Sequence, residues 1–268
     1  MSTTRVYHTM LQVLRHLCPS ERITRVRTLA TLMRGILEAR AVQLPLVAQR
    51  IPSAAKARSI VRRLERWLDN PAVRVQAWYR PVADAWLRDQ ARTTGQIRVI
   101  IDTSKVGFAH HLVLVSLAFQ RRAIPIAWTW LRCRNGHSSQ RVQLAVLGAV
   151  QALIPDGTPV LLVGDTEFAA VGLQAQAAAW GWHDVLRQKP NNQVQVAQES
   201  PWQAFRSLVT APGQRVWVPD VHLTRVYGHP AHVLAEWAVG ERTPICRPPA
   251  RPCGPIGAGC GWKNCLAI

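Results

Sequence analysis

The sequence predicts an α/β core built on a mixed β-sheet and preceded by a small all-α domain. Two observations predict the core. Short β-branched runs end at an aspartate in RVIIDTSKVG and PVLLVGDTEF, and strand-like and helix-like runs surround them. A third observation predicts the leading domain, because apolar side chains recur at helical spacing in residues 1–97, which carry 17 basic against 6 acidic residues.

Length and charge limit the class of protein. The 268 residues allow one large domain or two smaller ones. The net charge of +18 and the pI near 11.3 favour a polyanionic partner, and nucleic acid is the usual one. Arginine-rich codon usage in a GC-rich genome is the alternative, although it would not by itself leave so few acids.

Nothing in the sequence indicates a membrane or a secretory route. No apolar run reaches the roughly 18 residues of a membrane helix, and MSTTRVYHTM lacks a signal-peptide core. We therefore expect a cytoplasmic, nucleoid-associated protein without membrane contact. In that compartment the six cysteines do not predict disulfides, and without a CxxC pair they do not predict a zinc site.

Residues 1–90 are predicted to form a helical DNA-binding domain. Helices are expected within residues 5–40, around 44–51, from 54 to 70 after Pro52 and Ser53, and over 75–87. The 54–70 helix gathers basic residues largely on one side, where they would contact duplex DNA, with one connection able to form a helix-turn-helix. These residues are Lys56, Arg58, Arg62, Arg63 and Arg66. A solvated charged face is the alternative interpretation. Polar residues 90–97 are expected to be a linker.

The second domain is predicted to span residues 97–242. Strands are expected at 98–102, 110–120 and 122–132, a helix at 141–154, a buried strand at 159–165, a helix at 167–181 and a strand at 182–189. This β-β-β-α-β-α-β order matches the ribonuclease-H-like fold. The first and fourth strands are neighbours in that fold, so Asp102 and Asp165 would lie close together.

Two carboxylates at one sheet edge suit a site for Mg²⁺ or Mn²⁺ in phosphodiester chemistry. The alternative is that Asp102 and Asp165 are ordinary turn or cap residues. Glu167 is interpreted as a helix-start acid, and Lys105 and Arg187 as phosphate contacts or solvated charges. Four tryptophans are interpreted as core residues: Trp128, Trp130, Trp180 and Trp182.

The succession IIDTSKVG, HHLVLVSLAFQRRAIPIAW, GHSS, VLLVGDTEF and WGWHDVLRQKPN resembles the DDE transposases of bacterial insertion sequences. The likeness is to the group with a Tyr-Arg-Glu-Lys signature, and it covers nearly the whole chain. It implies a ribonuclease-H-like core, dependence on Mg²⁺ or Mn²⁺, and binding of double-stranded transposon ends. It also implies that Asp102 and Asp165 are catalytic metal ligands, the latter within a GD-x-x-F motif. A homodimer on DNA is left open.

The sequence departs from that family after a β-rich insertion that begins at about residue 190. No Tyr-Arg-Glu-Lys spacing follows, and no carboxylate follows Glu241. Residues 243–268 are expected to be an out-of-frame or disordered tail. This departure leaves two hypotheses: a transposase by descent that is inactive as written, or a DNA-binding remnant that inhibits a full-length relative.

Overall fold

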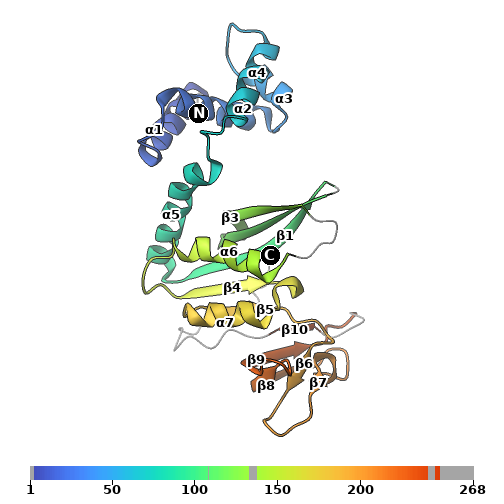
Figure 1. Cartoon of the computed structure of the whole chain (residues 1–268). Helices are drawn as coiled ribbons and strands as arrows, with labels where there is room; N and C mark the ends of the chain where they lie inside the picture. Colours follow the sequence, from blue (N-terminus) through green and yellow to red (C-terminus); the bar gives the residue numbers. More distant parts are fainter. Residues whose placement is uncertain (1–2, 108, 133–137, 241–244, 248–268) are drawn as a thin grey trace. The chain divides into compact units, whose positions relative to one another are not determined.

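The computed structural model describes residues 3–107, 109–132, 138–240 and 245–247. They divide into two compact units, Met1–Val82 and Ala83–Ile268, with the division inside a helix (Figure 1). None of the described helices is both long and apolar enough to span a membrane.

The first unit is all-helical, as predicted. It contains α1 (Thr3–Leu17), α2 (Ile23–Ala39), α3 (Leu44–Arg50), α4 (Ala57–Leu68) and the start of α5 (Val75–Thr94). One apolar cluster joins α2, α3 and α4 through buried residues such as Val47 and Leu64. A second joins α1 and α2 to Trp78, whose ring meets Trp67 edge-on at 5.9 Å. The short helices are therefore stabilised by packing.

Helix α4 begins three residues later than the sequence predicts. Ser53 opens a turn in which its Oγ accepts the Ala55 N–H at 3.1 Å. The chain bends at residues 54 and 55, and the helix starts at Ala57, after Lys56. Such a side-chain bond to a nearby backbone N–H competes with helix formation, which explains the difference.

The predicted linker at residues 90–97 is mostly helical, which corrects the prediction. Helix α5 continues to Thr94, and the chain turns at Gly95, whose φ is +68°. Thr93 and Thr94 bond to carbonyls four residues back, while Arg88 pairs with Asp84. These local bonds satisfy the polar side chains within the helix.

The second unit contains a five-stranded mixed sheet. Its strands are β1 (Ile97–Val106), β2 (His110–Phe119), β3 (Arg122–Arg132), β4 (Val160–Gly164) and β5 (His183–Leu186), in the order β3-β2-β1-β4-β5. The first three strands are antiparallel, as predicted, and β4 runs parallel to both β1 and β5. The prediction that the first and fourth strands are neighbours is confirmed.

Two helices cover one face of this sheet, α6 (Gln140–Gln151) and α7 (Val171–Ala179) (Figure 1). The helix predicted at 167–181 is split. A short 3₁₀ turn, η1 (Thr166–Phe168), comes first, and α7 starts only at Val171. The split follows from the Asp165 side chain, which caps the turn, and from Phe168, which is fully buried.

A second five-stranded sheet follows, in the β-rich segment that the sequence predicts after residue 190. Its strands are β6 (Gln193–Gln195), β7 (Gln203–Ala204), β8 (Arg215–Leu223), β9 (His229–Glu236) and β10 (Ile245–Arg247). Strand β10 lies within the predicted tail of residues 243–268 and pairs with β9. The remainder of that tail and Glu241 lie outside the described residues.

Candidate functional site

Asp102 and Asp165 occupy equivalent positions on neighbouring parallel strands. The ladder between β1 and β4 runs from the Ile97–Val160 pair to the Ile101–Gly164 pair, and an aspartate follows each member of the last pair. Neighbouring strands lie about 4.8 Å apart. The two aspartates therefore follow the last pair of the parallel ladder, one on each strand.

One part of the prediction is corrected here: Asp102 does not end its strand. Strand β1 continues to Val106, because its other edge stays paired with β2 as far as the Val106–His110 pair. Only the β4 side of β1 becomes free after Ile101. Asp102 therefore lies where β1 is paired with β2 alone.

Gly164 allows the two strand ends to approach each other. A Cβ atom added at Gly164 would lie 2.9 Å from Leu186 Cδ2, 3.0 Å from Ile101 Cγ2 and 3.2 Å from Phe168 Cβ. Phe168 is itself fully buried. The glycine and the phenylalanine of the GD-x-x-F sequence thus anchor the turn that carries Asp165.

Both aspartates are exposed, and each is held by one backbone bond. Oδ1 of Asp102 accepts the Thr103 N–H at 2.8 Å, and Oδ1 of Asp165 accepts the Glu167 N–H at 2.9 Å. Neither aspartate forms an ion pair within the described part of the chain. Two oxygen donors without a cation partner fit the ligand preference of Mg²⁺ or Mn²⁺.

A third ligand does not lie with them among the described residues, where no group of three His, Cys, Asp or Glu side chains is placed to hold a metal ion. Glu236 pairs instead with Arg215 at 2.7 Å.

Glu167 has a role that the sequence did not reveal. Its Oε1 atom accepts the Thr103 hydroxyl at 3.1 Å, the Ser138 N–H at 2.7 Å and the Ser138 hydroxyl. Buried Gln143 in turn donates to Ser138 O and Oγ at 3.2 and 3.1 Å. Glu167 lies in the first turn of η1, as a helix-start acid would, but its carboxylate joins three separate segments. The serines before α6 were the only sequence signal for this network.

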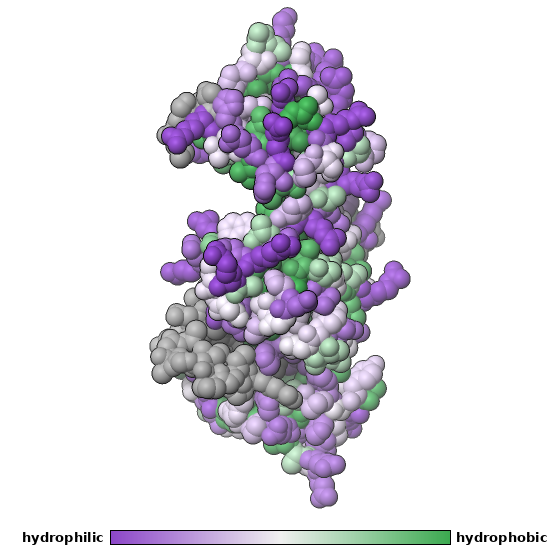
Figure 2. Space-filling view, turned by 90° about the vertical axis from the view of Figure 1, so that its left-hand side faces the viewer, coloured by the Kyte–Doolittle hydropathy of each residue, from purple (hydrophilic) through white to green (hydrophobic). Residues whose placement is uncertain are grey.

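The predicted DNA-binding residues on α4 are all exposed. Ile60 and Leu64 bury the opposite side of the helix. Among the described residues, no acidic side chain pairs with the basic residues of α4, whereas α2 and α5 hold four ion-paired arginines. Figure 2 shows hydrophilic side chains over much of the visible surface of this unit. The structure thus leaves these cations available for an external anion.

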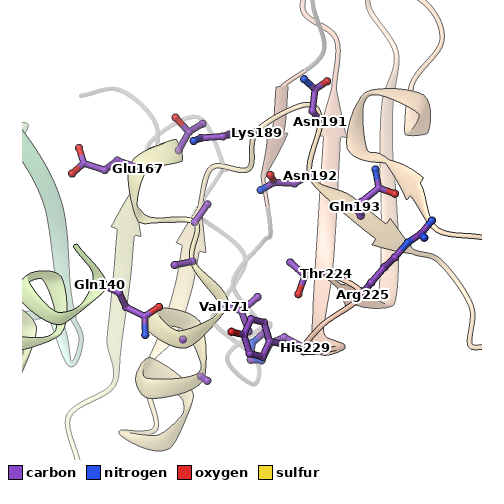
Figure 3. Close-up of a pocket in the computed structure, with 16 residues that line it drawn as sticks. Gln140, Glu167, Val171, Lys189, Asn191, Asn192, Gln193, Thr224, Arg225 and His229 are labelled. Atoms are coloured by element: carbon purple, nitrogen blue, oxygen red, sulfur yellow. The ribbon is translucent and has the colours of Figure 1, made fainter. Parts of the chain in front are cut away.

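A cleft of about 930 Å³ opens beside η1. Figure 3 shows its lining side chains, which come from the starts of α6 and α7 and from η1 on one side and from the strand-rich segment on the other. Lys189 and Arg225 are its cationic residues, Glu167 is its acid, and Thr224 Oγ1 is buried without a partner among the described residues. Sequence patterns do not predict this cleft, because it brings together residues far apart in the chain.

The remaining predicted residues are divided between surface and core. Lys105 and Arg187 are both exposed, and the Arg187 N–H donates to Gly164 O at 3.0 Å. Trp182 is buried and lies 5.1 Å from Trp180 between ring centres. Trp130 is 56% exposed, which corrects its assignment to the core; it lies on β3, at the edge of the sheet.

Comparison with solved structures gave distant structural likenesses, and two of them are a transposase and an Argonaute. No protein-family model and no curated protein matches the chain. A piggyBac transposase in a synaptic complex with hairpin DNA aligns with a TM-score of 0.44 and 11% identity over 91% of this chain, which spans 58% of the length of that protein. The Argonaute of Marinitoga piezophila, in complex with guide RNA and target DNA, aligns with a TM-score of 0.28 and 6% identity over 78% of this chain and 31% of its own. Both TM-scores are low, so neither likeness carries an argument about function.

Proposed function

We propose that the chain is a DNA-binding protein of the DDE transposase type, with Asp102 and Asp165 as two carboxylates of a divalent-metal site. The observation that carries this proposal is the parallel pairing of β1 with β4, which leaves an aspartate at the same level on each strand. We assign the strand order β3-β2-β1-β4-β5 to the ribonuclease-H-like fold on the same ground.

The site suits phosphodiester chemistry because its two carboxylates can bind a divalent metal ion and are exposed to solvent. Asp102 and Asp165 would hold Mg²⁺ or Mn²⁺ through the oxygens that no backbone N–H occupies. Such an ion, when bound, stabilises the charge that develops on the attacking and leaving oxygens. Both carboxylates are open to solvent, so a DNA phosphate has direct access.

Helix α4 supplies the second part of the proposal, the binding of double-stranded DNA at transposon ends. The exposed cations of the helix and of the residue before it are Lys56, Arg58, Arg62, Arg63 and Arg66. Because no acid of the described chain neutralises them, they remain free to displace counterions from DNA. They lie opposite the buried face that fixes α4 against α2 and α3.

A second candidate function is DNA binding without cleavage. One observation favours it: a third metal-ligating side chain does not accompany Asp102 and Asp165 within the described residues. A chain with the DNA-binding helix and an incomplete metal site would occupy element ends and could inhibit a complete transposase.

Metal binding tests the proposed site directly. Titration of the full chain with Mn²⁺ by calorimetry should give a binding signal that Asp102→Asn and Asp165→Asn each abolish. Asp156→Asn is the matched control, because it removes an equally exposed aspartate of the same unit from a turn. Binding that survives both variants, or that the control weakens equally, would refute the metal site.

A further inference from the structure

The two site aspartates are linked by a continuous path of hydrogen bonds through Thr103 and Glu167. Thr103 donates its N–H to Asp102, and Glu167 donates its N–H to Asp165. The side chains of these same two residues bond to each other, from Thr103 Oγ1 to Glu167 Oε1 at 3.1 Å. One side-chain bond between β1 and η1 therefore ties together the two residues that bond to the carboxylates.

The Thr103–Glu167 bond lies on the side of β1 away from Asp102. Successive side chains of a strand point to opposite faces, so Thr103 shares its face with buried Ile101. Ser138, 9% exposed, holds Glu167 from the start of α6, and Gln143, 2% exposed, holds Ser138. The bond is therefore anchored in the interior.

Resting on the proposed function, we infer that Glu167 and Thr103 are positioning residues for the metal site. They set the separation of Asp102 and Asp165 through the backbone N–H groups that each carboxylate accepts. Glu167 acts through Asp165 and not as a third ligand, because its Oε1 already accepts three hydrogen bonds and the described residues contain no three-member metal group.

The chemistry explains why a carboxylate suits this position. Glu167 Oε1 accepts three hydrogen bonds, and a charged carboxylate oxygen is a better acceptor for them than a neutral amide oxygen. Charge-assisted hydrogen bonds are shorter and stronger than neutral ones. Residues that orient metal ligands commonly change metal affinity by about 10–100-fold when they are replaced. An effect of this size should therefore follow from loss of the Thr103–Glu167 bond.

The experiment measures Mn²⁺ affinity and thermal unfolding of the full chain in four variants. Thr103→Val removes the hydroxyl at constant shape, and Glu167→Gln removes the charge. Thr103→Ser restores the hydroxyl, and Thr166→Val is the control, because it changes the residue between Asp165 and Glu167. We expect Thr103→Val and Glu167→Gln to weaken Mn²⁺ binding about tenfold at nearly unchanged Tm, with Thr103→Ser and Thr166→Val within about twofold of the wild type.

Two outcomes overturn the inference while leaving the metal site intact. In the first, Asp102→Asn abolishes binding but Thr103→Val and Glu167→Gln do not weaken it. In the second, affinity falls only in proportion to a large loss of Tm and Thr103→Ser does not restore it, so that the bond serves stability alone.

Amide hydrogen exchange gives a readout that needs no metal. Thr103→Val should speed exchange of the Glu167 N–H several-fold, because the turn that presents it to Asp165 loses its tie to β1. The N–H of Val221, in the second sheet, should exchange as before. If wild-type protein binds no Mn²⁺, the proposed function fails, and unchanged exchange at Glu167 would in addition refute the positioning role.

Discussion

At the scale of single residues, sequence patterns predicted some side chains of the site and missed others. The two aspartates were predicted because each follows a β-branched run. The Glu167 network was not, because its partners Thr103 and Ser138 are 64 and 29 positions away in the chain. Short-range patterns detect a strand that delivers a carboxylate, but they do not detect the side chains that hold it in place.

Replacement of Gly164 tests whether the ends of β1 and β4 must pack closely beside Asp165. We expect Gly164→Ala to lower the free energy of unfolding by about 1–3 kcal/mol, because the added methyl group meets Leu186, Ile101 and Phe168 at 2.9–3.2 Å. The measurement is urea denaturation. Gly148→Ala is the control, since a Cβ there meets nothing within 4 Å and should stabilise α6 by about 0.5–1 kcal/mol. A neutral Gly164→Ala would show that the strand ends can separate freely.

Asp184 predicts a dependence of stability on pH. Burial raises the pKa of this β5 carboxyl to about 6, from an ordinary value of 3.8. Between about pH 4 and pH 6 the folded state therefore holds a proton that the unfolded state has released, so the free energy of unfolding falls as pH rises through that window. The cost is absent below about pH 4 and complete above about pH 6.

Asp184→Asn should remove that cost. We expect a gain on the order of 3 kcal/mol at pH 7.5 and none at pH 4, because a pKa change of one corresponds to about 1.4 kcal/mol. Denaturation at the two pH values measures the difference, with exposed Asp156→Asn as the control. An equal effect of Asp184→Asn at both pH values would contradict the assignment to burial.

At the scale of elements, helix positions followed from apolar spacing, while helix ends did not. Local side-chain bonds moved the ends: Ser53 delays α4, the Asp165 cap splits η1 from α7, and the bonds of Thr93 and Thr94 extend α5. Strand pairing followed from the order of elements. The edge position of β3, which exposes Trp130, depends on the whole sheet and did not follow from a local pattern.

The unpaired arginines of α4 should contribute more to DNA affinity than the ion-paired arginines of α2 and α5. We expect a variant with four α4 arginines replaced by alanine to bind duplex DNA more weakly and with a smaller salt slope, by up to about 3–4 in log K against log salt. These arginines are Arg58, Arg62, Arg63 and Arg66. The measurement is fluorescence anisotropy of the full chain at several salt concentrations.

The matched control replaces four arginines that pair with acids on or beside their own helices, Arg25, Arg34, Arg88 and Arg92. It changes the net charge equally and should weaken binding less. Equal losses in the two variants would mean that total charge alone attracts DNA, without a particular role for α4.

At the scale of the whole molecule, the order of elements predicted the fold class better than the ends of the elements. The basic first third corresponds to a helical unit, and the later order of elements to a mixed sheet. Polar residues 90–94 have the composition of a linker, although they continue helix α5. The cleft beside η1 depends on contacts between segments that are distant in the chain.

The number of metal ligands beside Asp102 and Asp165 determines whether the chain can cleave DNA. We expect the 268-residue chain to nick plasmid DNA in Mn²⁺ no faster than its Asp102→Asn variant. Two-metal chemistry needs ligands for both ions, and among the described residues no third His, Cys, Asp or Glu is placed to share a metal ion with Asp102 and Asp165. Loss of one electrostatic contribution to a transition state costs about 10²–10³ in rate, and loss of a metal position should cost more.

Nicking of plasmid DNA on a gel measures this rate, with Asp156→Asn as the control for a general effect of charge. Mn²⁺-dependent nicking that disappears only in Asp102→Asn would contradict the expectation. It would mean that a residue outside the described part of the chain completes the site. Glu241 would be the first to replace, because it is the last acid in the sequence and Glu236 is already paired with Arg215.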